Sequence, residues 1–188
     1  MKNLALVCVV SLALAACHNN RVSETSSVSS TDSQVVVSKT VDINGVKVQS
    51  SLALTQFAMR AALGNNPNTA AYVTIQNAGK SDDRLVSAAC ACATTTSLHT
   101  MKMTGTTMEM AEVKDGFTIK PGETITFAPG GNHIMLENLT QRPQAGQTVD
   151  LILTFEKAGP VTLHLPVSNT PLARTGTSGG MDHGDMKM

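Results

Sequence analysis

The segment HTMKMTGTTMEM, residues 99–110, concentrates side chains that can bind a soft metal ion. It holds one histidine and four methionines, interrupted by Lys102, Glu109 and several threonines. Alternate side chains of a β-strand point to the same face. A two-residue turn at Thr104 and Gly105 would therefore place all five candidates on one face of a hairpin: His99, Met101, Met103, Met108 and Met110. In that register Met103 pairs with Thr106, Met101 with Met108, and His99 with Met110.

A second histidine and another methionine follow in the segment His133-Ile134-Met135, again two residues apart. Opposed side chains of paired strands lie roughly 4.5–5.5 Å apart at Cβ, close enough for two of them to bind the same ion. Thioether sulfur is soft and neutral, and together with imidazole it favours copper in the cuprous state. The sequence predicts a Cu(I) site formed by His99, Met110, His133 and Met135, with Met101, Met103 and Met108 as auxiliary ligands.

The alternative is that these methionines only fill an apolar core, which is their usual role. Their distribution argues against it. Five of the ten methionines lie between residues 101 and 135, and the apolar strand segments 148–155 and 161–167 contain none.

The C-terminal sequence MDHGDMKM repeats the same ligand types after a polar, glycine-rich run. No packed strand is expected there, so core filling does not explain the methionines. We expect a second, weaker copper site formed by Met181, His183, Met186 and Met188. Asp182 and Asp185 add hard oxygen ligands, so this tail can also hold Cu(II).

The N-terminus carries Lys2, an apolar run and the ending Leu-Ala-Ala-Cys at Cys17. The run is too short for a membrane span and is typical of a secretory signal. The ending resembles a bacterial lipobox, which implies cleavage before Cys17 and lipidation of its thiol. We expect a lipid-anchored protein of the cell envelope that faces the periplasm. A Ser/Thr-rich tether over residues 18–49 follows the anchor, and it is expected to be disordered up to about residue 34.

Short apolar segments separated by Gly, Pro and Asn turns fill the rest of the chain, without a long amphipathic helix. Nine strands are expected between Leu52 and Val167, and a small hairpin around Asn44-Gly45. The pattern predicts one all-β domain over residues 50–168, an antiparallel Greek-key β-sandwich, with a flexible tail over residues 169–188.

Composition excludes several functions. The formal net charge is zero and no basic run occurs, so nucleic acid is not an expected partner.

Only Cys90 and Cys92 remain as thiols after signal cleavage and lipidation. Residues two apart in an extended strand lie about 6.6–6.8 Å apart at Cα, the far edge of disulfide geometry. A bridge would need a local bend, so the pair is strained, reduced or a second site for a soft metal. A blue-copper site is disfavoured because no cysteine follows Cys92.

The site residues resemble the motif of the periplasmic copper(I) chaperones of the PCu(A)C type. That motif is His or Met, ten residues, Met, about twenty-one residues, then His-x-Met. Here His99, ten residues, Met110 and twenty-two residues lead to His133-Ile134-Met135. Further matches are AAYVTIQNAGKSDDRLVSAAC (70–90), PGGNHIMLENLTQ (129–141) and LTFEKAG (153–159). Phe57 departs from the family, which has a tryptophan ahead of Arg60.

The resemblance implies a cupredoxin-like sandwich that binds one Cu(I), has no enzymatic activity and delivers the metal towards an apo copper protein such as a cytochrome oxidase subunit. A periplasmic copper scavenger without dedicated transfer is an alternative, because it needs the same ligands. A thiol oxidoreductase using Cys90 and Cys92 is a further alternative, although no helix N-terminus is expected to activate a thiolate there.

Overall fold

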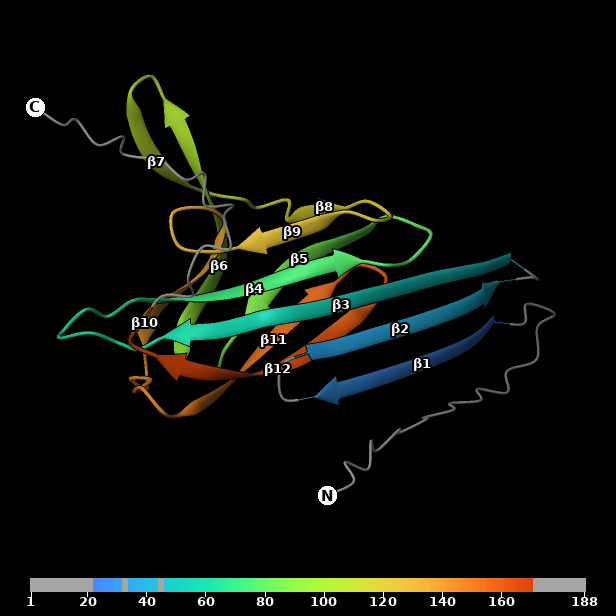
Figure 1. Ribbon diagram of the computed structural model, residues 1–188, viewed down its shortest axis with the longest axis horizontal. Coiled ribbons are helices and arrows are strands. Elements are labelled where there is room, and N and C mark those ends of the chain that lie inside the picture. Colours follow the sequence, from blue (N-terminus) through green and yellow to red (C-terminus); the bar gives the residue numbers. More distant parts are fainter. Residues whose placement is uncertain (1–21, 32–33, 44–45, 171–188) are drawn as a thin grey trace, which may run out of the picture.

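The structure, a computed structural model, describes residues 22–31, 34–43 and 46–170 (Figure 1). Twelve strands and no helix occur in these ranges, so no described helix could span a membrane. The strands are β1 (Val22–Thr31), β2 (Gln34–Ile43), β3 (Val46–Arg60), β4 (Thr69–Asn77), β5 (Asp83–Ala89), β6 (Ala93–Thr104), β7 (Thr107–Glu112), β8 (Phe117–Ile119), β9 (Thr124–Phe127), β10 (His133–Leu139), β11 (Thr148–Phe155) and β12 (Gly159–Ser168).

The strands form two layers. One runs in the order β7-β6-β10-β4-β3, with β2 and β1 continuing from β3 and with β9 beside β4. The other runs β12-β11-β5-β8. Strand neighbours that are distant in sequence, such as β4 and β10, reflect the crossing connections of a Greek-key arrangement. Among the named strands of the described chain, the pairing is antiparallel except between β12 and the end of β3, at Met59 and Arg60.

The core lies between these layers because their strands alternate in polarity. In β12, Val161, Leu163, Leu165 and Val167 are buried, and the residues between them face solvent. Leu151, Leu153 and Phe155 of β11 pack into the same cluster, together with apolar residues of β3 and β4. This two-residue period is the signature of a half-buried sheet, and the predicted all-β sandwich is confirmed.

The disorder predicted for residues 18 to about 34 is wrong for most of that segment, which forms β1. β1 and β2 pair along ten residues, from Val22 opposite Ile43 to Thr31 opposite Gln34. The side chains of residues 23–31 in β1 are exposed, so this strand contributes almost nothing to the core. A strand without core side chains can have a Ser/Thr-rich composition, and that composition predicted disorder. β1 is held instead by backbone pairing with β2, which in turn pairs with β3.

The hairpin predicted around Asn44-Gly45 is confirmed, because Ile43 of β2 faces Val46 of β3; its two turn residues lie outside the described residues. The expected nine strands are all present. β8 was not predicted, since three residues are too few to display an alternation. The expected signal segment 1–17 and residues 171–188 of the tail also lie outside the described residues.

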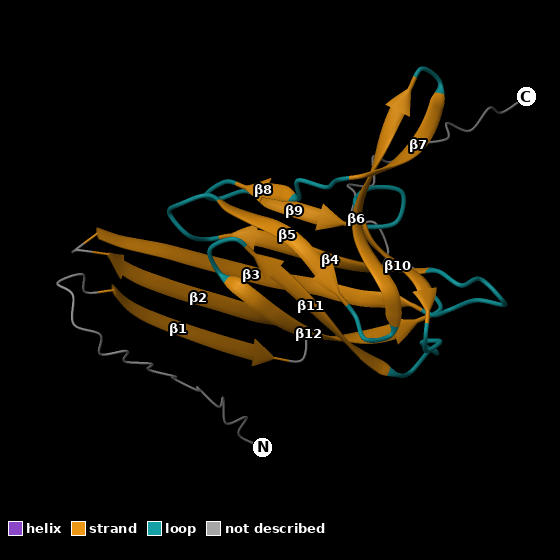
Figure 2. Cartoon of the chain, turned by 180° about the vertical axis from the view of Figure 1, so that it is seen from behind, coloured by secondary structure: helices purple, strands orange, loops and turns teal. Residues whose placement is uncertain are grey.

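The β6–β7 hairpin stands away from the sandwich (Figures 1 and 2). Its turn residues are Gly105 and Thr106, so the predicted turn at Thr104-Gly105 is wrong by one residue. Gly105 has a φ of 64° and Thr106 does not have a positive φ. Glycine at the first central position is what a type II′ hairpin turn requires, and this sets the register of the two strands.

Candidate metal centre

The two candidate histidines come together at the junction of β6 and β10. These strands are antiparallel, and His133 lies directly opposite His99. The ring centroids are 5.5 Å apart. His99 is buried, with 9% of its surface exposed, and His133 is half-buried. Two imidazoles that are distant in sequence thus share one face of the sheet.

The two candidate methionines lie on the same face. Met135 is two residues beyond His133 and opposite Ser97. Met110 pairs with Met101, one step further out along the hairpin, and Met103 pairs with Met108. The expected direct pairing of His99 with Met110 is therefore wrong, since Glu112 lies opposite His99. Because the shift is by two residues, the face of every side chain is unchanged.

Met110 reaches the histidines from the hairpin. Its sulfur lies 3.1 Å from Nε2 of His133, although the pairing partner of Met110 is Met101. The side chain is 51% exposed. Met110 therefore contacts the imidazole without being packed into the core.

The hydrogen bonds of His133 indicate its tautomer. Nδ1 lies 3.0 Å from the carbonyl oxygen of Gly131, which can only accept, so Nδ1 carries the proton and donates it. Nε2 is then unprotonated, and its lone pair is beside the sulfur of Met110. Two electron-pair donors face each other at this point, an arrangement that a cation between them would make favourable.

His99 is oriented by a different partner. Its Nε2 lies 2.9 Å from Oγ of Ser97, and the same hydroxyl donates to a carboxylate oxygen of Glu137 at 3.5 Å. Since the hydroxyl has one hydrogen and directs it to Glu137, we infer that Nε2 of His99 donates to Oγ of Ser97 and that Nδ1 holds the lone pair. Nδ1 is buried and has no hydrogen-bond partner among the described residues. A buried lone pair without a partner is less costly than a buried N–H without one, and it is available to a metal ion.

The donor set suits a soft, singly charged cation. Two neutral imidazole nitrogens and the thioethers of Met110 and Met135 supply no negative charge, which fits Cu(I) better than zinc or calcium. Within the described ranges, no group of three or more His, Cys, Asp or Glu side chains could hold a metal. Ser97 and Glu137 were not predicted. Ser97 is two residues from His99, and Glu137 is two residues from Met135, so the strand period could have placed both on this face. The hydrogen bond between them joins two strands, and the sequence does not predict it.

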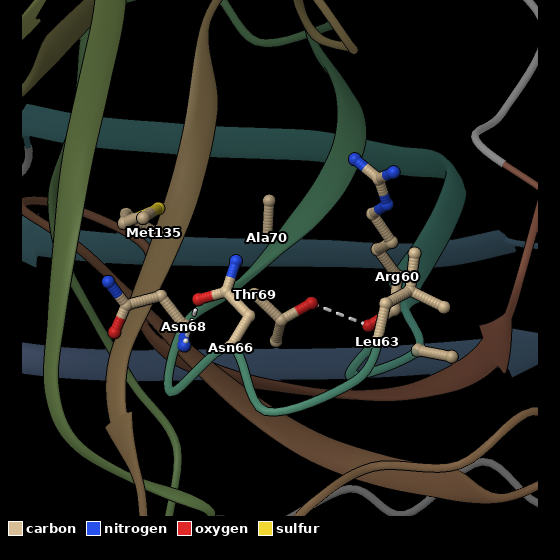
Figure 3. Close-up of a pocket in the computed structure, with 8 residues that line it drawn as sticks. Arg60, Leu63, Asn66, Asn68, Thr69, Ala70 and Met135 are labelled. Atoms are coloured by element: carbon tan, nitrogen blue, oxygen red, sulfur yellow. Dashed lines mark hydrogen bonds between the residues drawn. The ribbon is translucent and has the colours of Figure 1, made fainter.

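Met135 borders a pocket of about 260 Å³ on its outer side. Figure 3 shows Met135 on one side of this pocket and Arg60 on the other, with Asn68 and Thr69 between them. Arg60 also acts on the neighbouring Tyr72. Burial raises the pKa of Tyr72, and the nearby Arg60 guanidinium partly opposes this. Met135 is thus open to the surface beside a cationic group.

The auxiliary candidates divide between described and undescribed segments. Met101 is half-buried, whereas Met103 and Met108 are exposed near the tip of the hairpin. The four tail candidates and the lipidation site lie outside the described residues: Met181, His183, Met186, Met188 and Cys17.

Cys90 and Cys92 form a disulfide, and the chain has the local bend that such a bridge requires. Residues 91 and 92 turn, which brings the two Cα atoms to 5.2 Å. The backbone carbonyl oxygen of Cys92 accepts hydrogen bonds from the N–H groups of Thr140 and Gln141, beyond β10. Both cysteines are buried in the core cluster, so the bridge fixes the start of β6, the strand that carries His99.

Comparison with known proteins assigns the family. A sequence profile described as "Putative lipoprotein LpqE-like" matches residues 52–167, which is more than half of the chain. The chain belongs to the LpqE-like family. It is 34% identical over 101 residues to "Putative lipoprotein Lxx21020" of Leifsonia xyli subsp. xyli (strain CTCB07). This match covers 54% of the chain and 61% of that relative, so it spans about three fifths of the relative's length. Family membership supports a lipid-anchored protein of the envelope.

Solved PCuAC domains share the fold of this LpqE-like protein. A structure titled "Copper-bound PCuAC domain from PmoF2" is 25% identical with a TM-score of 0.53, and covers 63% of this chain and 93% of its own. The structure titled "apo PmoF2 PCuAC domain" is also 25% identical, with a TM-score of 0.52 and coverages of 62% and 89%. These matches confirm the PCuAC resemblance and the cupredoxin-like sandwich.

Proposed function

We propose that this LpqE-like protein binds one Cu(I) through His99, Met110, His133 and Met135 and hands it to another copper protein outside the cytoplasm. The observation that carries the proposal is the state of the two histidines. In each ring one nitrogen is hydrogen-bonded, to Gly131 in His133 and to Ser97 in His99. The other nitrogen lies beside the sulfur of Met110 in His133 and has no partner among the described residues in His99.

The accessibility of the ligands suits transfer rather than catalysis. Met110 is half exposed and Met135 borders an open pocket, so ligands of an acceptor can reach the ion from two sides. Transfer then proceeds by exchange of neutral ligands, with copper staying in the cuprous state and without loss of a proton. The acceptor is an apo copper protein, for which a cytochrome oxidase subunit is our candidate.

The anchor belongs to the same proposal. Lipidation of Cys17 tethers the domain to the membrane and keeps it facing the periplasm. More than one acyl chain is needed for a stable anchor. Membership of a family of putative lipoproteins supports this part of the proposal, and mass spectrometry of the mature N-terminus checks it.

The ligand set is tested by replacing Met110 and Met135 together with leucine. Leucine keeps volume and apolarity, so the fold should persist while Cu(I) binding collapses. The matched control is Met59→Leu, because Met59 is a core methionine with 1% exposure. Cu(I) affinity is measured by competition with a chromophoric Cu(I) chelator under reducing, anaerobic conditions. Wild-type affinity in the double variant would refute the site.

The direction of transfer requires a second experiment. Copper-loaded protein is mixed at equal concentration with an apo fragment of an oxidase subunit that carries its copper ligands. We expect metal to move to the fragment through a short-lived complex. If the protein retains all of its copper, it acts as a scavenger instead.

The tail would extend the capacity of the domain. Met181, His183, Met186 and Met188 supply a weaker site, and their tether keeps them near the domain at roughly millimolar effective concentration. Truncation after Leu172 should remove the tail-bound copper and leave the tight site unchanged. If the truncated protein binds as many ions as the full chain, the tail has no role in binding copper.

A further inference from the structure

Sulfur side chains line one face of the β6–β7 hairpin beyond the histidines. Met103 lies opposite Met108, and Met101 lies opposite Met110 one step closer to the sandwich. Met103 is 63% exposed and Met108 is 50% exposed. The hairpin extends away from the two layers, so this face does not pack against the core (Figures 1 and 2).

The opposite face of the hairpin is polar. Lys102 lies opposite Glu109, and the hydroxyl of Thr104 donates to a carboxylate oxygen of Glu109 at 3.1 Å. Both faces therefore meet solvent, and core filling does not explain the methionines. Between Met101 and Met110 the sulfur-bearing face contains no branched aliphatic or aromatic side chain. Protein interfaces are enriched in aromatic side chains as well as in methionine, and this face has methionine alone.

We propose that Met103 and Met108, together with Met101, form a second, weaker Cu(I) site that loads the His99–His133 centre. This inference rests on the proposed function, because a loading site requires a site to load. Opposed side chains start roughly 4.5–5.5 Å apart at Cβ, and successive pairs along a strand are separated by about 6.6–6.8 Å. The long, flexible methionine side chain covers both distances, so three thioethers can meet around one ion.

The pairs form a short path into the site. Copper enters at Met103 and Met108, passes to Met101 and Met110, and ends at the histidines. In the last step, Sδ of Met110 stays bound to copper, and the bond to the sulfur of Met101 breaks as the bond to Nε2 of His133 forms. Copper stays Cu(I), and no proton moves because a thioether carries none. The outer site is weaker because it lacks imidazole and is exposed to water.

The test uses the full-length protein with methionine methyl groups labelled with ¹³C. Ag(I), a soft cation without redox chemistry, is titrated first, and Cu(I) buffered by a chelator follows. We expect the methyl signals of Met110 and Met135 to shift at the first equivalent and those of Met103 and Met108 afterwards. Tail methionines give separate signals, so copper held by the tail is counted apart from copper held by the hairpin.

Two variants complete the test. Met103→Leu/Met108→Leu should lose one bound ion, keep the affinity of the histidine site, and load that site more slowly from the chelate. Lys102→Gln/Glu109→Gln changes the polar face and keeps every sulfur, so it should behave as the wild type. Unchanged stoichiometry and loading rate in the leucine variant would overturn the proposal.

Two further outcomes are distinguishable. If Met103 and Met108 respond only when an apo acceptor protein is added, the hairpin is a docking surface and the loading site is overturned. If instead Met110→Leu/Met135→Leu keeps the tight Cu(I) site, the proposed function fails, and the loading site fails with it. Failure of the loading site alone leaves the tight site intact.

Discussion

Ser97 should control copper affinity although it is not a metal ligand. Its hydroxyl lies 2.9 Å from Nε2 of His99 and donates towards Glu137, which keeps the proton of the imidazole on Nε2. Ser97→Ala removes the acceptor for that proton. The ring is then free to turn or to move its proton to Nδ1, and either change removes the lone pair from the metal position.

The magnitude follows from the contacts. A neutral hydrogen bond contributes about 0.5–1.5 kcal/mol to stability, so the metal-free variant should unfold about 1–6 °C lower. Loss of an outer partner of a histidine ligand costs about 10–100-fold in metal affinity, which corresponds to about 1.4–2.7 kcal/mol. The effect on Cu(I) binding should therefore exceed the effect on the fold.

Cu(I) affinity is measured by chelator competition, and thermal unfolding is followed by circular dichroism in the same samples. Ser97→Thr keeps a hydroxyl and should restore most of the affinity. Ser87 is an exposed serine on β5, so Ser87→Ala is the matched control and should change neither quantity. If Ser97→Ala binds Cu(I) as tightly as the wild type, the hydroxyl does not set the tautomer of His99 and the assignment of Nδ1 as the ligand atom is refuted.

Three further predictions concern the scaffold. Gly116→Ala should destabilise the domain by about 2–5 kcal/mol in urea unfolding, because Gly116 has a φ of 73° and a new Cβ would clash with the carbonyl oxygen of Leu85. The control is Gly122→Ala, which should cost only about 1–2 kcal/mol, because Gly122 has a similar φ of 77° but open space around it. Asp83→Asn should lower the free energy of unfolding by about 1–3 kcal/mol in the same assay. The buried carboxylate accepts hydrogen bonds from the backbone N–H groups of Lys157 and Ala158, at 2.9 and 3.0 Å. An amide NH₂ cannot accept, so the variant loses one of these bonds. Burial raises the pKa of Tyr72, so the folded state favours the neutral phenol. The contribution of this phenol to the free energy of unfolding is complete below about pH 10 and is lost as pH rises through the folded pKa. Tyr72→Phe should remove this loss of stability at alkaline pH, and an unchanged alkaline profile of stability in the variant would contradict the prediction.

Much of the candidate site follows from local sequence. Spacing by two residues fixes which side chains share a face of a strand, whatever the strand pairs with. His99, Met101 and Met103 therefore share a face, and so do His133 and Met135. The error of one residue in the hairpin turn did not alter this, because it shifted the pairing by two residues.

Other features depend on partners that local sequence does not specify. Polar composition predicted disorder for β1, yet β1 is a strand because β2 offers it a continuous row of backbone groups. Extended geometry argued against a bridge between Cys90 and Cys92, yet a turn at residues 91–92 brings them together. In each case a contact with another part of the chain decides the conformation.

The sequence by itself determined the chemistry of the donors, the alternation of the strands and the face on which each ligand lies, because these are properties of residue type and backbone period. Only the tertiary structure decided that β10 lies against β6, which sets His133 opposite His99. It also decided which nitrogen of each imidazole is free, because Gly131 and Ser97 take up the other one. Strand neighbours and hydrogen-bond partners arise from packing of the whole chain, and no short segment contains that information.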